Sequence, residues 1–151
     1  MPVAFDLSLL ARVLLTLVTL GYGFLTILAD FNNTHATNPK WTGHARFHVV
    51  WQITSYVGFG LLALALLWWP GSLAMERLYL VAVMSGIVYA AFFVALFAMP
   101  IYGGTAYDSN GYRPFDAPLP IIARKWDANI TAFTVQVILL AAGISSLVAA
   151  G

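Results

Sequence analysis

The chain has 151 residues, of which 61% are hydrophobic and 9% are charged, and its formal net charge is +1. Soluble domains carry about a quarter charged residues, so this composition excludes an ordinary soluble protein and indicates a membrane protein. The small net charge argues against nucleic acid as a partner, and the absence of cysteine excludes disulfides and thiolate metal ligands.

Four segments are long and apolar enough to cross a hydrocarbon layer of about 30 Å, which needs roughly 20 helical residues. The first is interpreted as a true span rather than a signal peptide, because it lacks a basic N-terminal region. The sequence therefore predicts a single domain over residues 1–151 that is all-α, an integral membrane four-helix bundle with up-down antiparallel topology. The expected spans are Leu7–Ala29, His44–Trp69, Leu73–Met99 and a last one that is hydrophobic by Ile130 and ends near Ala150.

The connections between these spans differ in length and polarity. The turn Trp69–Ser72 contains proline and glycine, which cannot continue a helix, so the second and third spans form an antiparallel hairpin. The other two loops, Asp30–Gly43 and the segment from Pro100 to about Leu119, are longer and polar. Up-down threading places both on one side of the membrane, and puts both termini on the other.

The last span is expected to begin near the end of the third loop. We expect the segment IIARKWDANITAF, residues 121–133, to begin the fourth helix at the membrane interface, with Pro120 in its first turn. The positive-inside rule predicts that the two polar loops are cytoplasmic, because most cations lie on their side. These cations are Lys40, Arg46, Arg113, Arg124 and Lys125, against Arg12 and Arg77 elsewhere.

The stretch from Asp30 to Gln52 contains all three histidines. His44 and His48 are four residues apart, so on a helix they lie one turn apart on one face. Ionisable groups at the mouth of a membrane helix are costly unless they face protein, water or a ligand. We therefore expect a cavity between the first, second and fourth spans, polar at its mouth and aromatic below. The expected lining residues are Tyr22, Asp30, His44, Arg46, His48, Trp51, Gln52, Tyr56, Arg124 and Asp127.

Two kinds of chemistry fit these residues. In the first, His44 or His48 exchanges protons with an apolar substrate beside a desolvated Asp30 or Asp127, because histidine titrates near neutral pH. The alternative role for each aspartate is a structural ion pair with Arg46 or Arg124 that joins two helices.

In the second kind, His44, His48 and His35 hold a single zinc or iron ion together with Asp30 or Asp127. Histidines at positions i and i+4 can chelate one ion, but no glutamate completes an HExxH motif. The alternative is that His44 and His48 only cap the helix and bond to loop carbonyls or lipid headgroups. The long third loop, rich in tyrosine, is of the kind that often covers a binding site.

The general layout, four short spans without a soluble domain and with polar residues at one end, resembles the DoxX-like group of small membrane proteins. Some of that group are associated with oxidoreductase systems, so the resemblance implies a redox association. The segment NPKWTGHARFHVVWQ, residues 38–52, resembles a signature of uncharacterised small membrane proteins. Four-helix sterol isomerases share the architecture and use buried carboxylates, but their motif has no residue-by-residue match here.

Two function classes follow from these patterns. The first is a small membrane enzyme or binding protein for a lipophilic molecule that enters from the bilayer. The second is a non-catalytic accessory subunit of a larger membrane complex, because glycine and alanine in the second and fourth spans suit close helix packing. A homo-oligomer is a possible assembly of a protein of the first class. Membrane lipids are expected partners in both, and the identity of the ligand stays open.

Overall fold

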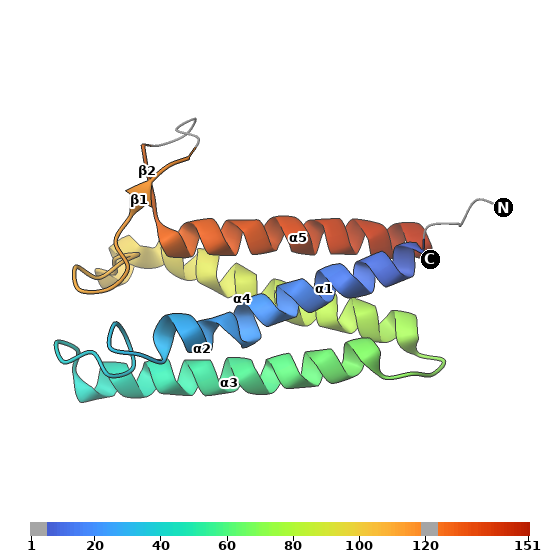
Figure 1. Cartoon of the computed structure of the whole chain (residues 1–151), viewed down its shortest axis with the longest axis horizontal. Helices are drawn as coiled ribbons and strands as arrows, with labels where there is room; N and C mark the ends of the chain where they lie inside the picture. Colours follow the sequence, from blue (N-terminus) through green and yellow to red (C-terminus); the bar gives the residue numbers. More distant parts are fainter. Residues whose placement is uncertain (1–5, 119–123) are drawn as a thin grey trace.

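The structure is a computed structural model that describes residues 6–118 and 124–151. It is an up-down antiparallel bundle in which the helices run side by side along one axis (Figure 1). Two long loops, which we call loop one (residues 31–42) and loop three (residues 103–118 and 124–127), lie at one end of the bundle. The α3–α4 hairpin lies at the other end, together with the beginning of α1 and the end of α5. The elements are α1 (Leu7–Gly23), α2 (Leu25–Asp30), α3 (Gly43–Trp68), α4 (Ala74–Tyr102), β1 (Phe115–Asp116), β2 (Lys125–Trp126) and α5 (Ala128–Ala150).

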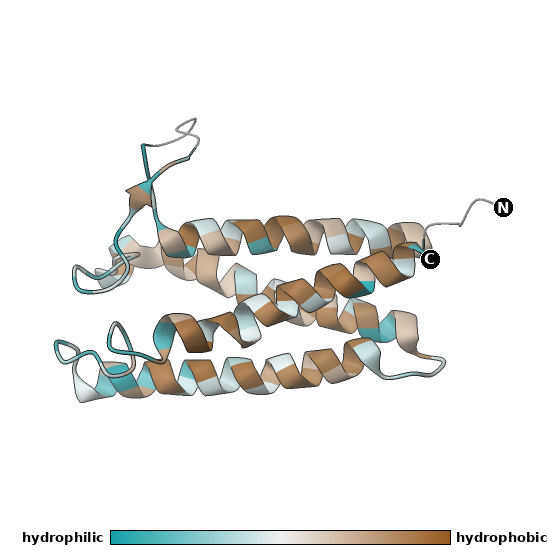
Figure 2. Ribbon diagram, in the orientation of Figure 1, coloured by the Kyte–Doolittle hydropathy of each residue, from teal (hydrophilic) through white to brown (hydrophobic). Residues whose placement is uncertain are grey.

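Hydropathy divides this bundle along its axis. Four helical segments within the described residues are long and apolar enough to cross a membrane, as the sequence predicts for a multi-pass membrane protein. Hydrophilic residues gather in the two long loops and at the adjoining helix ends, whereas the middle of the bundle is mostly hydrophobic (Figure 2). The all-α four-helix fold is therefore confirmed, and its polar chemistry lies mainly at the loop end.

The first span is interrupted, although the sequence predicts one continuous helix. Phe24 separates α1 from α2 with φ −127° and ψ −35°. Just before this break α1 crosses α3, and a Cβ atom built on Gly23 would lie 3.1 Å from the Cα atom of Gly60. Two glycines therefore let the two backbones approach closely, as small residues do in membrane helix packing.

The third loop begins later than the sequence predicts. The expectation that the helix ends before Pro100 is wrong, because α4 continues through Pro100 to Tyr102. A proline this close to the helix end removes only one backbone hydrogen bond, so the last turn still forms. Gly103, with φ +67°, then ends the helix, and the N–H of Gly104 donates to the carbonyl of Met99 at 3.0 Å.

The fourth helix also begins later than predicted. The expectation of helix in the segment 121–133 is wrong for residues 124–127, because Lys125–Trp126 form β2, which pairs antiparallel with β1. The reason for the helix start is Asp127, whose carboxylate accepts a hydrogen bond from the N–H of Ile130 at 3.0 Å as the N-cap of α5. The expected position of Pro120 in the first turn lies outside the described residues.

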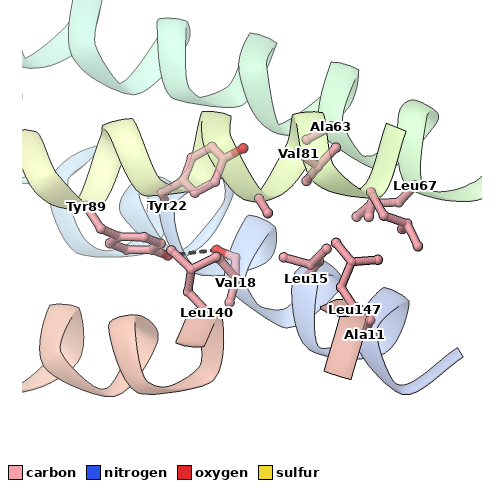
Figure 3. Close-up of a cluster of buried hydrophobic side chains, with 12 residues drawn as sticks. Ala11, Leu15, Val18, Tyr22, Ala63, Leu67, Val81, Tyr89, Leu140 and Leu147 are labelled. Atoms are coloured by element: carbon pink, nitrogen blue, oxygen red, sulfur yellow. Dashed lines mark hydrogen bonds between the residues drawn. The ribbon is translucent and has the colours of Figure 1, made fainter. Parts of the chain in front are cut away.

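The core of the bundle is apolar toward the hairpin end and aromatic toward the loops (Figure 3). Leu15 and Leu147 are fully buried, and the ring of Tyr22 packs edge-on against that of Tyr89 with 6.0 Å between centroids. The Tyr89 hydroxyl donates to the carbonyl of Val18 at 2.7 Å (Figure 3). A buried phenol needs such a partner in lipid, and this bond joins α4 to α1 just beneath the polar end.

Candidate functional site

A cavity of about 320 Å³ opens at the loop end of the bundle, and we call it the main cavity. Its walls come from α1, α2, α3, α4, α5 and loop one, so α4 contributes in addition to the three spans that the sequence predicts. Its polar lining residues are Thr26, Asp30, His35, Gln52, Asn129 and Gln136. Its apolar and aromatic lining residues are Gly21, Leu25, Ala29, Trp41, Val49, Tyr89, Phe92, Ala132 and Phe133.

The aromatic wall of the main cavity is a packed cluster. The rings of Phe92 and Phe133 stack with 3.9 Å between centroids, and Tyr89 packs edge-on against Phe133 at 5.5 Å. Between α1 and α5 Gly21 leaves room for the Gln136 side chain, whose Cδ atom lies 2.5 Å from where a Gly21 Cβ would stand. The cavity thus presents flat apolar surface beside a few polar groups, the usual composition of a small-molecule site.

Asp30 and His35 form the ionisable pair of the main cavity. The carboxylate Oδ1 of Asp30 lies 3.6 Å from Nδ1 of His35, and their side chains are only 24% and 19% exposed. Asp30 is the last residue of α2, and loop one returns beside it because the N–H of Ala36 donates to the Asp30 carbonyl at 3.0 Å. Local chain reversal therefore brings a carboxylate and an imidazole together at the edge of the membrane region.

The hydrogen-bond network assigns the proton on His35. Thr34 Oγ1 lies 2.6 Å from Asn32 Oδ1 and 2.8 Å from His35 Nδ1, and the Asn32 amide nitrogen donates to the carbonyls of Leu28 and Ala29. A hydroxyl has one proton and an amide oxygen only accepts, so Thr34 donates to Asn32 and accepts from His35. Nδ1 of His35 therefore carries the proton, and Nε2 of the neutral ring holds the lone pair.

A second cavity, of about 170 Å³, adjoins the first on the loop side, and we call it the vestibule. Three residues line both spaces: His35, Trp41 and Asn129. The remaining vestibule wall is loop three, which contributes Thr105, Ala106, Tyr107, Asp108 and Tyr112. Loop three therefore covers the polar end of the site, and two of its tyrosines, Tyr107 and Tyr112, line the vestibule.

Two side-chain hydrogen bonds hold loop three against loop one, and we call them the loop clasp. The Trp41 indole N–H donates to Asp108 at 2.9 Å, and the Asn110 amide donates to the buried Asn38 at 2.8 Å. The backbone N–H of Asn110, and then the Trp41 indole, hold the pKa of the Asp108 carboxyl below its usual value. Asp108 is therefore ionised at neutral pH.

The structure places His44 and His48 away from the main cavity. Both are exposed on α3, and they face each other with 3.1 Å between their Nε2 atoms. Phe47 and Trp51 lie beside them and are about 60% exposed, which makes this a ring-rich outer surface of the helix. The prediction that His44 and His48 line the cavity with Asp30 is therefore wrong, because the inward face of α3 carries Val49 and Gln52 instead.

Three other residues of the predicted site lie outside the lining of the main cavity. Asp127 caps α5, Arg124 is exposed, Arg46 is half-buried, and none of them lines the main cavity. Of the remaining predicted residues, Gln52 lines the cavity, whereas Tyr22 and Tyr56 pack in the core below it and Trp51 is exposed.

The proposed ligand sets and ion pairs do not assemble as predicted. Within residues 6–118 and 124–151, no three His, Asp or Glu side chains are grouped to hold a metal ion, so His35 does not join His44 and His48. In the same ranges the ion pairs are Asp30 with His35 and Asp116 with Lys125. The predicted clamps between aspartate and arginine are therefore not formed there.

Several lining residues escaped the sequence analysis. Gln136 lies in the middle of an apolar span, and its buried Oε1 atom has no hydrogen-bond partner among the described residues. An amide at such a position is expensive in lipid, and that signal alone marks it as a candidate. Trp41 and Asn129 belong to no sequence motif or periodic pattern that indicates a binding site. Only the folded loops bring these two residues together with His35.

Comparisons with known proteins give a family but no activity. No curated protein and no solved structure matches the chain. One family model does match the chain, over residues 13–125, and these residues include most of the lining of both cavities. By this match the chain belongs to the family described as a family of unknown function, DUF6640.

Proposed function

We propose that this protein binds a lipophilic small molecule from the bilayer and transfers a proton to or from it at the Asp30–His35 pair. The observation that carries the proposal is the location of this mostly buried pair on the wall of a 320 Å³ cavity whose remaining lining is mostly apolar and aromatic, with a few uncharged polar side chains. Ionisable groups at membrane depth usually serve function, and a cavity of this composition suits a mainly apolar ligand with few polar atoms.

The chemistry follows from the tautomer of His35. Nε2 holds the lone pair and is the nitrogen that takes a proton from the ligand, while Nδ1–H stays bonded to Thr34. The imidazolium that forms lies 3.6 Å from the Asp30 carboxylate, which stabilises its charge in a site screened from water. The same proton can then return to the ligand at a second atom, so the pair supports an isomerisation without any net change in charge.

We further propose that the loop end faces the cytoplasm, on the positive-inside rule. The two cations at the other end are engaged there: Arg12 lies over the Trp68 ring at 5.5 Å, and Arg77 donates to the Trp69 carbonyl at 2.7 Å. The layout resemblance to DoxX-like proteins extends this proposal to an association with a redox system, for which the test is copurification from gently solubilised membranes.

The binding step is tested by identifying what the purified protein retains. Protein extracted in mild detergent is analysed by mass spectrometry for small molecules, alongside Gly21→Leu, which fills the main cavity at the wall occupied by Gln136. The matched control is Gly58→Leu on α3, where an added side chain meets nothing within 4 Å. Retention by the wild type and the control, with loss in Gly21→Leu, supports the proposal. Equal retention by all three, or by none, overturns it.

A second variant guards against misfolding of Gly21→Leu. Gln136→Ala enlarges the cavity and removes its unpartnered amide, so it should change which molecule is retained while leaving the thermal stability close to that of the wild type. An unchanged set of retained molecules in Gln136→Ala contradicts binding in the main cavity.

The accessory-subunit function stays the second candidate, on the outward surface of α5. Ala141, Ala142 and Ser145 are exposed there, and the Ser145 hydroxyl bonds back to the Ala141 carbonyl at 2.9 Å, which leaves a smooth small-residue surface. Stable copurification with a larger membrane protein, abolished by Ala142→Leu and preserved in Gly21→Leu, would favour this function over the first.

A further inference from the structure

We propose that the vestibule is a binding site for an organic ammonium group, so that the ligand of the main cavity is an amphiphilic amine or a choline-type lipid. This inference deepens the proposed function and rests on it only for the apolar part of the ligand. The juxtaposition that carries it is the ring set Trp41, Tyr107 and Tyr112 around the ionised Asp108 in one space of about 170 Å³.

The ring content of the vestibule is the first argument. Trp41, Tyr107 and Tyr112 line it together with the His35 imidazole, which lies edge-on to Trp41 at 5.2 Å and tilted against Tyr112 at 6.1 Å. The faces of aromatic rings attract cations, and rings grouped around one space are the usual way in which proteins recognise quaternary ammonium groups. The volume admits a small organic group rather than a single water molecule.

The sign of the charge is the second argument. Asp108 lies on the vestibule wall, and Asp30 lies on the adjoining cavity beside His35, a residue common to both spaces. An anionic headgroup would meet a carboxylate from either direction, whereas a cation would be stabilised by both. Lys40 is the nearby opposing charge, and it is exposed outside the lining of both spaces.

The kind of cation is the third argument. A hydrated metal ion needs several carboxylate or imidazole ligands at once, and the described residues contain no group of three. An alkylated ammonium is weakly hydrated and needs rings and one carboxylate, which the vestibule has. The Trp41 indole N–H is bonded to Asp108, so ring and carboxylate are held in fixed relation.

Continuity between the two spaces defines the ligand as a whole. His35, Trp41 and Asn129 line both, so a molecule with its ammonium group in the vestibule reaches the main cavity with its apolar part. The ammonium group then lies on the side of the vestibule where His35 joins the two spaces, and the proton that His35 transfers belongs to an atom near that group. This arrangement selects amphiphiles with one positive head and one apolar body.

The test uses tetramethylammonium as the probe and neopentane-1-ol as a neutral comparison of similar shape, with the full chain in nanodiscs. Saturation-transfer and chemical-shift NMR of the N-methyl protons should show binding and an upfield ring-current shift for tetramethylammonium. Asp108→Asn keeps an acceptor for Trp41 but removes the charge, so it should weaken binding about tenfold, as should Trp41→Leu, whereas Trp41→Phe should restore most of it. The matched controls, Asp116→Asn and Trp68→Phe, should bind like the wild type.

The composition of the nanodisc distinguishes the two sources of the ammonium group. If choline lipids occupy the vestibule, tetramethylammonium should bind more weakly in phosphatidylcholine nanodiscs than in nanodiscs of digalactosyldiacylglycerol, a choline-free lipid that also has no net charge. If a free amine is the ligand, the two nanodiscs should give equal affinity. Both results support an ammonium site.

The proposal is overturned if neopentane-1-ol binds as tightly as tetramethylammonium, if Asp108→Asn has no effect, or if tetramethylammonium does not bind. Retention of a neutral or anionic lipophile without tetramethylammonium binding would remove the ammonium site and keep the proposed function. Binding of tetramethylammonium without any retained lipophile would keep the ammonium site and overturn the proposed function.

Discussion

The two histidine sites of this protein arise from one stretch of chain and differ in almost every physical respect. His35 is mostly buried, lies 3.6 Å from Asp30, has its Nδ1 proton fixed by Thr34, and lines both cavities. His44 and His48 are exposed, and their nearest polar partners are each other. Of the two, only His35 is shielded from water, has a charged partner and lies on a cavity wall, and these are features that functional ionisable groups commonly share.

The spacing of two residues in the sequence predicts that they are neighbours on a helix, but it does not predict which way that face of the helix points. Positions i and i+4 place His44 and His48 together on α3, and the structure confirms that proximity. The orientation of α3 is set by its packing against α1, where Gly60 meets Gly23, and this turns the histidine face outward. His35 has no periodic signal, because it lies in a loop whose return beside Asp30 depends on backbone hydrogen bonds.

Removing the histidines of each site in turn should have the largest effect. His35→Gln should lower the rate of deuterium exchange between the retained molecule and D₂O by about 10²- to 10⁴-fold, the usual contribution of a general acid or base. The double variant His44→Gln/His48→Gln should leave that rate unchanged. Mass spectrometry of the extracted molecule after timed incubation in D₂O measures both, and the reverse pattern would move the chemistry to the outer surface.

The second largest effect concerns the packing that orients α3. A leucine at Gly60 would clash with the α1 backbone, since a Cβ at Gly60 already lies 3.1 Å from the Gly23 Cα atom. Gly60→Leu should therefore destabilise the protein by about 1–3 kcal/mol, the usual cost of overpacking. Gly58→Leu on the outward face should change stability by less than about 0.5 kcal/mol. Thermal unfolding in detergent compares them, and equal stability would mean that α3 is rotated relative to this structure.

The positions of the membrane spans can be predicted from the sequence, but the exact helix ends cannot. Length and hydropathy fix the four spans, because a bilayer imposes a minimum length on any helix that crosses it. The helix ends are less predictable: Pro100 indicates a stop, yet a proline in the last turn removes only one hydrogen bond and α4 continues to Tyr102. The start of α5 is determined by the cap at Asp127, a residue that the sequence analysis assigned to catalysis.

The candidate site was predicted in part, for physical reasons. Asp30 and Gln52 were found because polar residues at span ends are costly in lipid. Trp41 and Asp108 could not be predicted, because their proximity depends on a contact between two irregular loops, the 2.9 Å bond from the Trp41 indole to Asp108. No periodicity encodes a contact of that kind.

The third prediction returns to the outer histidines. An Nε2–Nε2 distance of 3.1 Å suits two ligands of one transition-metal ion, for which each bond is about 2.0–2.1 Å. Added Ni²⁺ or Zn²⁺ should therefore bind the wild type, and His44→Ala or His48→Ala should weaken binding on the order of tenfold, about 1.4 kcal/mol. His35→Ala is the control and should bind normally. Isothermal titration measures this, and equal loss in His35→Ala would restore the three-histidine site.

The smallest effect concerns the loop clasp that covers the inner site. Because the Asn110 N–H and the Trp41 indole hold the pKa of Asp108 below its ordinary value of about 3.9, the ionised carboxylate strengthens the clasp at all pH values above that. The contribution should be lost only as the pH falls below about 4 and through the folded-state pKa. The ¹⁹F resonance of 5-fluorotryptophan at Trp41, assigned by its absence in Trp41→Phe, should therefore shift as the pH falls below about 4. Asp108→Asn should remove the acid-induced shift, and the Trp69 resonance serves as the control. A shift of the Trp41 resonance between pH 7 and 5 that disappears in His35→Gln would instead be assigned to His35, whose ring lies 5.2 Å from that of Trp41. In that case the cover over the site and its proton-transfer group would respond to the same proton, and the two histidine sites would differ in regulation as well as in position.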